Sequence, residues 1–266
     1  MTLFDTWQTW SGVVRSLGIY YGRSARRGDM DQLYRNFIRA GDLVFDIGAH
    51  VGDRIASFRR LRARVVAVEP QPALARTLKL LYGRDRLVAI EATAIGRHSG
   101  SVELKINPSN PTVSSASDAF IKASDGAPGW EGQHWTKTVT VPLITLDALI
   151  ARHGTPSFIK LDVEGFEVEA LNGLTRPVPA LSFEFTTIQR DVAAAGVARC
   201  AELGFRCFNA ALGESQTLVH DGWLDAKAIA DWLDALPMTA NSGDVYALRS
   251  RPSDAAGLAQ GSETHI

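Results

Sequence analysis

Hydrophobic residues along the chain gather into short runs rich in β-branched side chains, and amphipathic segments separate these runs. Runs that are apolar at nearly every position are typical of strands buried on both faces of a parallel sheet. The pattern predicts strands over 43–48, 64–70, 87–95, 158–165, 180–186, 205–210 and 244–249. The amphipathic segments predict helices over 54–61, 72–82, 146–152, 166–174 and 188–203.

Two segments interrupt this alternation. Residues 101–106 and 137–143 alternate between apolar and polar positions, which predicts an inserted pair of strands. Residues 107–136 between them are rich in Ser, Gly and Pro, and a connection of that length is usually a lid, a binding loop or a disordered segment. Strands that alternate with helices predict an α/β fold, with a mostly parallel sheet and helices on both of its faces.

The same pattern suggests how the chain is organised. Residues 1–40 look helical and hold six arginines, so we expect an N-terminal helical segment there. Residues 41–249 form the expected main domain, with an insert over 101–143. Residues 250–266 are small and polar, which is typical of a disordered tail.

Composition narrows the classes of function. The 266 residues are 45% hydrophobic, enough for the core of one large domain, and a net charge of -1 gives no whole-chain case for nucleic-acid binding. The two cysteines, Cys200 and Cys207, form no disulfide framework and read as packing residues. No apolar run reaches the roughly 18 residues of a membrane span, and the first residues lack the pattern of a signal peptide. We therefore expect a cytoplasmic protein without a membrane span, and the oligomeric state stays open.

The stretch LVFDIGAHVG (43–52) predicts a strand, a glycine-rich turn and the start of a helix. Such a turn lets a nucleotide-like ligand approach the backbone, beside the free N–H groups of the helix. An acidic residue, Glu69, ends the next strand 23 residues after Asp46. This spacing is close to the roughly 20 residues expected for a carboxylate that binds ribose hydroxyls.

Three details disfavour NAD as the ligand. The glycines Gly48 and Gly52 form G-x-x-x-G, and His50 stands where a dinucleotide turn needs its second glycine. Asp46 would also repel a pyrophosphate. S-adenosylmethionine has an adenosine and positive charge but no phosphate, so it suits this turn better. An NAD-dependent oxidoreductase and a non-catalytic nucleotide-binding protein remain the alternative hypotheses.

Five segments together resemble the FkbM family of class I S-adenosylmethionine-dependent methyltransferases. They are GDLVFDIGAHVG (41–52), VVAVEPQP (65–72), ATAIGRHSGSVEL (92–104), VPLITLDALI (141–150) and FIKLDVEGFEVEALNGL (158–174). The resemblance implies a Rossmann-like sheet of seven strands whose last strand, here 244–249, is antiparallel. It also implies O-methylation of a small molecule or glycan. The family usually has Asn at the position of His50, so the contact to the methionine end of the cofactor can differ here.

A set of residues at the ends of the first four strands is the expected cofactor site. The resemblance puts Asp46 near the amino acid end of the cofactor, while Thr93 and Ala94 would follow the adenine edge. The full expected set is Asp46, Gly48, Ala49, His50, Gly52, Glu69, Pro70, Thr93, Ala94 and Asp162.

Carboxylates at the ends of two neighbouring strands are the candidate catalytic groups. Asp162 and Glu164 end the strand over 158–165 and would face the same side if the strand continued through them. We expect Asp162 to be the base that takes the hydroxyl proton, with Glu164 and Glu184 as alternatives. A divalent metal held by these carboxylates is possible in principle but is not favoured. In the long loop, His134 and Trp135 are the candidate substrate contacts. The arginines from Arg54 to Arg64 read as a solvated helix face.

Overall fold

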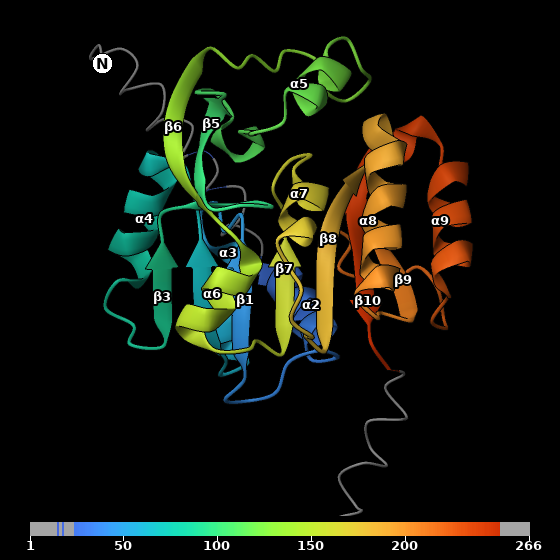
Figure 1. The fold of residues 1–266 in the computed structure, drawn as a ribbon, viewed down its shortest axis with the longest axis horizontal. Coiled ribbons are helices and arrows are strands. Elements are labelled where there is room, and N and C mark those ends of the chain that lie inside the picture. Colours follow the sequence, from blue (N-terminus) through green and yellow to red (C-terminus); the bar gives the residue numbers. More distant parts are fainter. Residues whose placement is uncertain (1–14, 16–17, 19–23, 251–266) are drawn as a thin grey trace, which may run out of the picture.

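The computed structural model describes residues 15, 18 and 24–250. Most of the predicted N-terminal helical segment and nearly all of the predicted tail lie outside the described residues. The main sheet has the strand order β3-β2-β1-β7-β8-β10-β9 (Figure 1). Its strands are β1 (Leu43–Ile47), β2 (Arg64–Val68), β3 (Val88–Glu91), β7 (Phe158–Leu161), β8 (Ala180–Thr186), β9 (Cys207–Leu212) and β10 (Ser242–Leu248).

The direction of the strands confirms the predicted fold class. Strands β1, β2, β3, β7 and β8 pair in parallel, whereas β10 runs antiparallel to both β8 and β9. The sheet is therefore mostly parallel, and its last strand is antiparallel as the sequence predicts.

Helices cover both faces of the sheet. One core cluster joins Phe45 and Ile47 of β1 to α6 (Leu146–His153), α7 (Glu167–Asn172), α8 (Arg190–Glu202) and α9 (Ala226–Ala235). A second cluster packs Val44 and Phe158 against α2 (Ser24–Tyr34), α3 (Asp53–Arg60) and α4 (Pro72–Tyr82). Successive residues of a strand point to opposite faces of the sheet. Val44 and Phe45 accordingly lie in different clusters, one on each face.

A small second sheet corrects the predicted pair of inserted strands. It has three strands in the order β4-β6-β5, with β4 (Ala94–Ile95), β5 (Gly100–Ile106) and β6 (Lys137–Ile144). The predicted strand over 87–95 is in fact two strands, because the chain leaves the main sheet after β3 and pairs with β6 instead. The insert lies over the carboxyl ends of the parallel strands (Figure 1).

The connection over 107–136 is not a continuous irregular loop. It contains the short helices η1 (Pro111–Val113) and α5 (Asp118–Ser124). The Ser117 side chain caps α5 by accepting the N–H of Phe120, whose ring is fully buried against Trp130. Helix α5 was not predicted, because its capping residue and short apolar face are hidden in a Ser-rich stretch.

The strand over 158–165 ends earlier than predicted, at Leu161. Residues 162–165 leave the sheet as a loop in which Glu164 and Gly165 both have positive φ. The expectation that Asp162 and Glu164 share a strand face is therefore wrong, since no strand continues through them.

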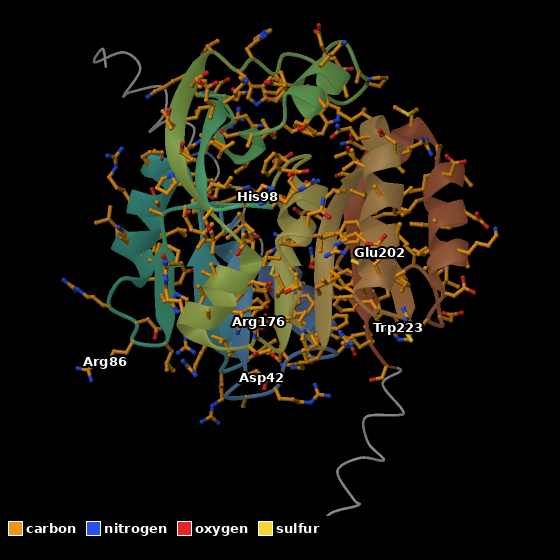
Figure 2. The ribbon with its side chains drawn as sticks, in the orientation of Figure 1. Asp42, Arg86, His98, Arg176, Glu202 and Trp223 are labelled. Atoms are coloured by element: carbon orange, nitrogen blue, oxygen red, sulfur yellow. The ribbon has the colours of Figure 1, made fainter. Side chains whose placement is uncertain are left out.

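The edge of the sheet opposite the insert is polar. Figure 2 shows Asp42, Arg86 and Arg176 at this amino-terminal edge, away from the insert. Among the described helices, none has the length and apolar character that crossing a membrane requires.

Candidate active site

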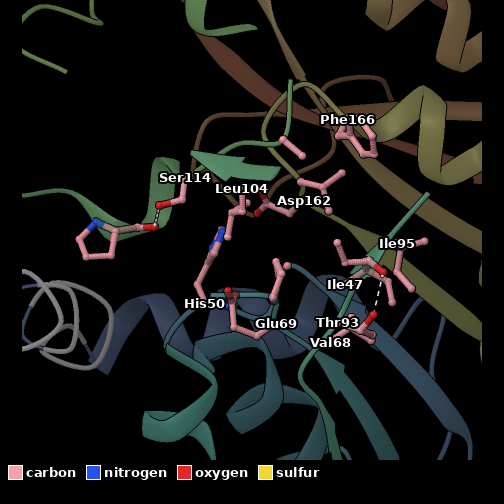
Figure 3. A pocket seen from close by; sticks show the side chains of 16 residues that line it. Ile47, His50, Val68, Glu69, Thr93, Ile95, Leu104, Ser114, Asp162 and Phe166 are labelled. Atoms are coloured by element: carbon pink, nitrogen blue, oxygen red, sulfur yellow. Dashed lines mark hydrogen bonds between the residues drawn. The ribbon is translucent and has the colours of Figure 1, made fainter. Parts of the chain in front are cut away.

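Two cavities lie between the carboxyl edge of the main sheet and the insert. The first holds about 490 Å³, counting the part open to solvent, and is mainly apolar. Figure 3 shows His50, Glu69, Thr93 and Asp162 around it. Its lining includes seven residues of the expected cofactor set: Gly48, His50, Glu69, Pro70, Thr93, Ala94 and Asp162. Seven of the ten expected cofactor residues therefore meet at one cavity.

The second cavity is larger and strongly polar, at about 1100 Å³ counted in the same way. Three residues, Gly48, His50 and Asp162, line both cavities, so the two meet at this point. Its acidic lining residues are Asp46, Asp53, Asp162, Glu164, Glu184 and Glu214, and its basic ones are Arg15, Arg54 and Lys160.

A single segment of the insert faces both cavities. Pro111 and Ser114 line the first cavity, whereas Asn110, Thr112 and Val113 line the second. Gln71, which follows strand β2, donates a hydrogen bond to the Ser114 hydroxyl at 2.8 Å. The insert is thus tied to the main domain through a residue that lines the first cavity.

Glu69 is held in place by the backbone around it. Its two carboxylate oxygens accept the N–H groups of His50 at 2.9 Å and of Gln71 at 2.8 Å. The side chain is 3% exposed, and burial raises its pKa to about 8. Each carboxylate oxygen can accept more than one hydrogen bond, so the remaining lone pairs can still bind a ligand in the first cavity.

The turn after β1 is shaped by close contact with the end of β7. Gly48 has φ 80°, and a Cβ placed on it would lie 1.7 Å from the Asp162 carbonyl oxygen. No other residue type fits there without moving the backbone. His50 also has positive φ, at 48°, a conformation in which Asn and His are both enriched, so either side chain suits this position.

Asp46 presents an unpaired carboxylate oxygen at this site. The residue is 1% exposed, and its Oδ2 atom has no hydrogen-bond partner among the described residues. Burial raises its pKa to about 7, although the nearby Lys160 ammonium opposes this shift. A buried carboxylate without a partner is costly, and a cationic ligand would compensate it.

Lys160 is a fully buried cation that faces the second cavity. Its ammonium contacts Asp162 Oδ2 at 2.8 Å and Asp244 Oδ1 at 3.3 Å. Lys160 pairs with Asp46 in the register of β1 and β7, so both side chains leave the same face of the sheet. Burial alone would raise the pKa of Asp162, but the Lys160 ammonium outweighs it and holds that pKa well below its usual range.

Glu164 and Glu184 differ from Asp162 in their surroundings. Each has a buried Oε2 atom with no partner among the described residues. Burial, reinforced by the Asp162 charge, raises the pKa of both carboxyls well above the usual value. Glu164 is 6% exposed, and the insert fixes its backbone because the Ser115 hydroxyl donates to its carbonyl oxygen at 2.6 Å.

Glu167 supports the loop that carries Glu164. Its Oε1 atom accepts the N–H groups of Val163 at 3.1 Å and Gly165 at 3.3 Å. The residue is 3% exposed, and burial raises its pKa to about 7. It lies in the motif that carries the family resemblance, but only the fold reveals that it holds this loop.

Several expected residues lie elsewhere. Asp46 and Ala49 line the second cavity rather than the first. Gly52 lines neither: it precedes α3 with φ 87°, and a Cβ there would collide with the side chains of Leu78 and Tyr82. His134 is exposed, and Trp135 donates its indole N–H to the Val113 carbonyl oxygen at 2.8 Å.

Neighbours of His134 and Trp135 line the second cavity in their place. These are Trp130 and Gln133 from the same loop. An acceptor contact from His134 or Trp135 stays a prediction that the fold does not support, because neither residue reaches the two cavities.

Arg54 corrects the expectation of a solvated arginine face. It is 8% exposed, lines the second cavity and pairs with Asp53 at 2.5 Å and Glu214 at 3.0 Å. Glu214 follows β9, about 160 residues away in the chain, so sequence proximity could not have shown this pair.

The strand order and the cavity at the carboxyl edge define a Rossmann-like α/β protein with a nucleotide-type site. The sequence profile of the methyltransferase FkbM domain matches residues 46–207, more than half of the chain. The chain therefore belongs to the FkbM methyltransferase family, as its motifs predict.

The individual proteins that the chain matches share little sequence identity with it. The chain is 27% identical over 169 residues to the hexuronic acid methyltransferase AglP of Haloferax volcanii, a match that covers 62% of this chain and 64% of the relative. A precorrin-6y C5,15-methyltransferase from Geobacter metallireducens gives a TM-score of 0.41 at 13% identity and covers 84% of this chain and 87% of its own. A TehB-like SAM-dependent methyltransferase from Corynebacterium glutamicum gives 0.42 at 10%, with coverage of 84% and 88%.

Proposed function

We propose that the protein transfers a methyl group from S-adenosylmethionine to a hydroxyl oxygen of a small molecule or glycan. The observation that carries this proposal is the meeting of two different cavities at Gly48, His50 and Asp162. A mainly apolar cavity whose wall holds the fixed Glu69 carboxylate suits an adenosine. The polar cavity beside it suits a hydroxylated acceptor. Membership of the FkbM family supports the same assignment.

Residues of the first cavity, together with Asp46 on the wall of the second, fit the proposed cofactor. Glu69, held by two backbone N–H groups, is positioned to accept hydrogen bonds from the two ribose hydroxyls. The unpaired Asp46 oxygen gives the ammonium of the methionine end a partner and satisfies a buried charge. Gly48 keeps the turn free of side-chain atoms where the two cavities meet.

The cofactor supplies an activated methyl group bonded to a positively charged sulfur. The protein has to hold the acceptor oxygen in line, exclude water and take up the hydroxyl proton. Asp162, the first candidate for the base, is paired with Lys160 and its pKa is lowered, so it is a poor proton acceptor. Glu164 and Glu184 have raised pKa values and unpaired oxygens, which suits a base.

Unpaired polar atoms support a hydroxylated acceptor. Trp130 Nε1 and Asn241 Oδ1 are buried atoms of residues that line the second cavity, and neither has a partner among the described residues. One is a donor and the other an acceptor, so a ligand with several hydroxyls can satisfy both. Trp130 also offers an aromatic surface for a sugar ring. The name of the Haloferax relative points to a sugar acid as its acceptor, which makes glycans the first acceptors to test.

Calorimetric titration with S-adenosylhomocysteine, S-adenosylmethionine and NADH tests the cofactor class. We expect both sulfur ligands to bind and NADH not to bind. Radiolabelled S-adenosylmethionine and a set of saccharides then test transfer. A label that survives mild alkali marks a methyl ether, whereas an alkali-labile label marks an ester. Binding of NADH alone would refute the proposal, and an ester product would refute the hydroxyl acceptor while leaving the cofactor assignment intact.

A further inference from the structure

Three side chains with metal-binding atoms come together where the two cavities meet. They are His50 from the turn after β1, and Asp162 and Glu164 from the loop after β7. One ligand atom from each lies within 4.8 Å of the others. The loop after β7 carries both carboxylates, and the Gly48–Asp162 contact brings the histidine to them.

We propose that His50, Asp162 and Glu164 bind a divalent transition-metal cation such as Mn²⁺. The sequence did not favour a metal, because the loop conformation that gathers these three side chains cannot be seen in it. This inference does not depend on methyl transfer, since it concerns a binding site that can be measured without a cofactor or an acceptor.

Glu164 provides the observation that a cluster of acids alone would lack. It is 6% exposed, and its Oε2 atom is buried without a partner among the described residues. A buried carboxylate oxygen of this kind requires a proton, a cation or a donor. A single cation here would contact both Glu164 and Asp162, because their ligand atoms lie within 4.8 Å of each other.

The other two ligands also retain free binding capacity. Asp162 binds Lys160 through Oδ2, which leaves Oδ1 for a metal. The His50 imidazole offers a ring nitrogen within 4.8 Å of the two carboxylates, and neutral imidazole is the commonest nitrogen ligand for metals in proteins. Lys160 thus acts as a second partner that orients the Asp162 ligand.

The spacing and the chemistry of the donors indicate the kind of ion. Neighbouring ligand atoms bound at about 2.1 Å to one octahedral ion lie about 3 Å apart. The ligand atoms here lie within 4.8 Å of one another, so side-chain movements of less than about 2 Å would bring them to that spacing. Carboxylates alone would suit Mg²⁺ or Ca²⁺, whereas an imidazole shifts the preference towards Mn²⁺ and the ions that follow it.

A cation at this point would add to the proposed reaction. It would bind the acceptor oxygen and lower the pKa of the hydroxyl. As the carbon–oxygen bond forms and the carbon–sulfur bond breaks, the hydroxyl proton would pass to Glu184, which lines the same cavity and is not a member of the cluster.

Electron paramagnetic resonance of Mn²⁺ titrated into untagged protein tests the site without cofactor. We expect wild-type protein to bind one ion, with nitrogen coupling from the imidazole in the spin-echo spectrum. Glu164→Gln should weaken binding at least about tenfold. His50→Asn should do the same and remove the nitrogen coupling, while Asn still fits the positive φ at this position.

Glu214→Gln is the matched control. Its carboxylate lines the same cavity but lies outside the cluster and pairs with Arg54, so its loss should change Mn²⁺ affinity less than about threefold. Thermal unfolding confirms that each variant is folded. Wild-type protein that binds no Mn²⁺ at about 1 mM, the weak end for protein sites, overturns the proposal. Equal affinity in wild type and Glu164→Gln also overturns it. A separate titration with S-adenosylhomocysteine reports on the proposed function alone.

Discussion

Replacing Glu69 by alanine removes the carboxylate that holds two backbone N–H groups beside the first cavity. In the folded protein it leaves the N–H groups of His50 and Gln71 without their acceptor. The pKa of Glu69 is about 8, so at pH 7 the carboxyl is largely protonated and each of these hydrogen bonds contributes about 0.5–1.5 kcal/mol. Water entering the open cavity replaces part of that, so we expect unfolding at pH 7 to become easier by about 1–2 kcal/mol. Loss of the ribose contacts should weaken S-adenosylhomocysteine binding by a further 1–3 kcal/mol, about five- to 150-fold.

The pH dependence of binding separates the two effects. Burial raises the pKa of Glu69 to about 8, and ribose hydroxyls donate to the ionised form. Ligand binding therefore releases a proton below that pH, and affinity should rise as the pH increases towards 8 and then level off. Calorimetry in two buffers of different ionisation enthalpy measures this proton release, which Glu69→Ala should abolish.

Glu91→Ala is the control for the Glu69 variant. Glu91 ends the neighbouring strand β3 and pairs with Arg152 and His153, but it lines neither cavity. Its loss should lower stability and spare S-adenosylhomocysteine affinity. If Glu69→Ala behaves in the same way, with lower stability and wild-type affinity, Glu69 has only a structural role and the proposed ribose contact is wrong.

Three other substitutions test the remaining charges. Asp162→Asn leaves Lys160 with one carboxylate, so chemical denaturation should show a loss of about 3–5 kcal/mol; an unchanged midpoint would contradict the buried pair. Glu184→Gln should lower single-turnover methyl transfer by roughly 10²–10⁴ with unchanged cofactor affinity, and a wild-type rate at every pH would rule out Glu184 as the base. The folded-state pKa of Asp46 is raised to about 7, so its contribution to stability is greatest below pH 4 and is lost as the pH rises towards 7. Asp46→Asn should flatten that decline by up to about 4 kcal/mol in unfolding experiments at several pH values, and an unaltered pH profile would place the titration elsewhere.

The sequence predicted the main sheet well because buried parallel strands leave a local record. Strands β1 and β2 are nearly continuous apolar runs, and helix α4 has the predicted bounds of 72–82, with Pro72 at its first turn. The run over 87–95 misled because apolar character does not say which sheet a residue joins. Helix α9 was missed although Asp225 caps it, since a short amphipathic segment near the chain end resembles a loop.

In the candidate site, too, the sequence indicated the parts that form locally but not the contacts between distant segments. Gly48 and Glu69 line the first cavity, and the sequence indicated the turn and the strand end that carry them because both form by local rules. The pairing of Lys160 with Asp162 and Asp244 depends on strands that meet only in the folded sheet. The walls of the second cavity combine residues from the insert, β8 and the region after β9, and no local pattern indicates that combination.

The segment 110–114 connects the two cavities mechanically. Some of its residues line the first cavity and others line the second, and together they form one continuous piece of chain. An acceptor that displaces this segment on entering the second cavity would therefore also strain the hydrogen bond between Gln71 and Ser114, which lines the first cavity. In the proposed reaction we therefore expect acceptor entry and cofactor exchange to be coupled, because both involve movement of this one segment.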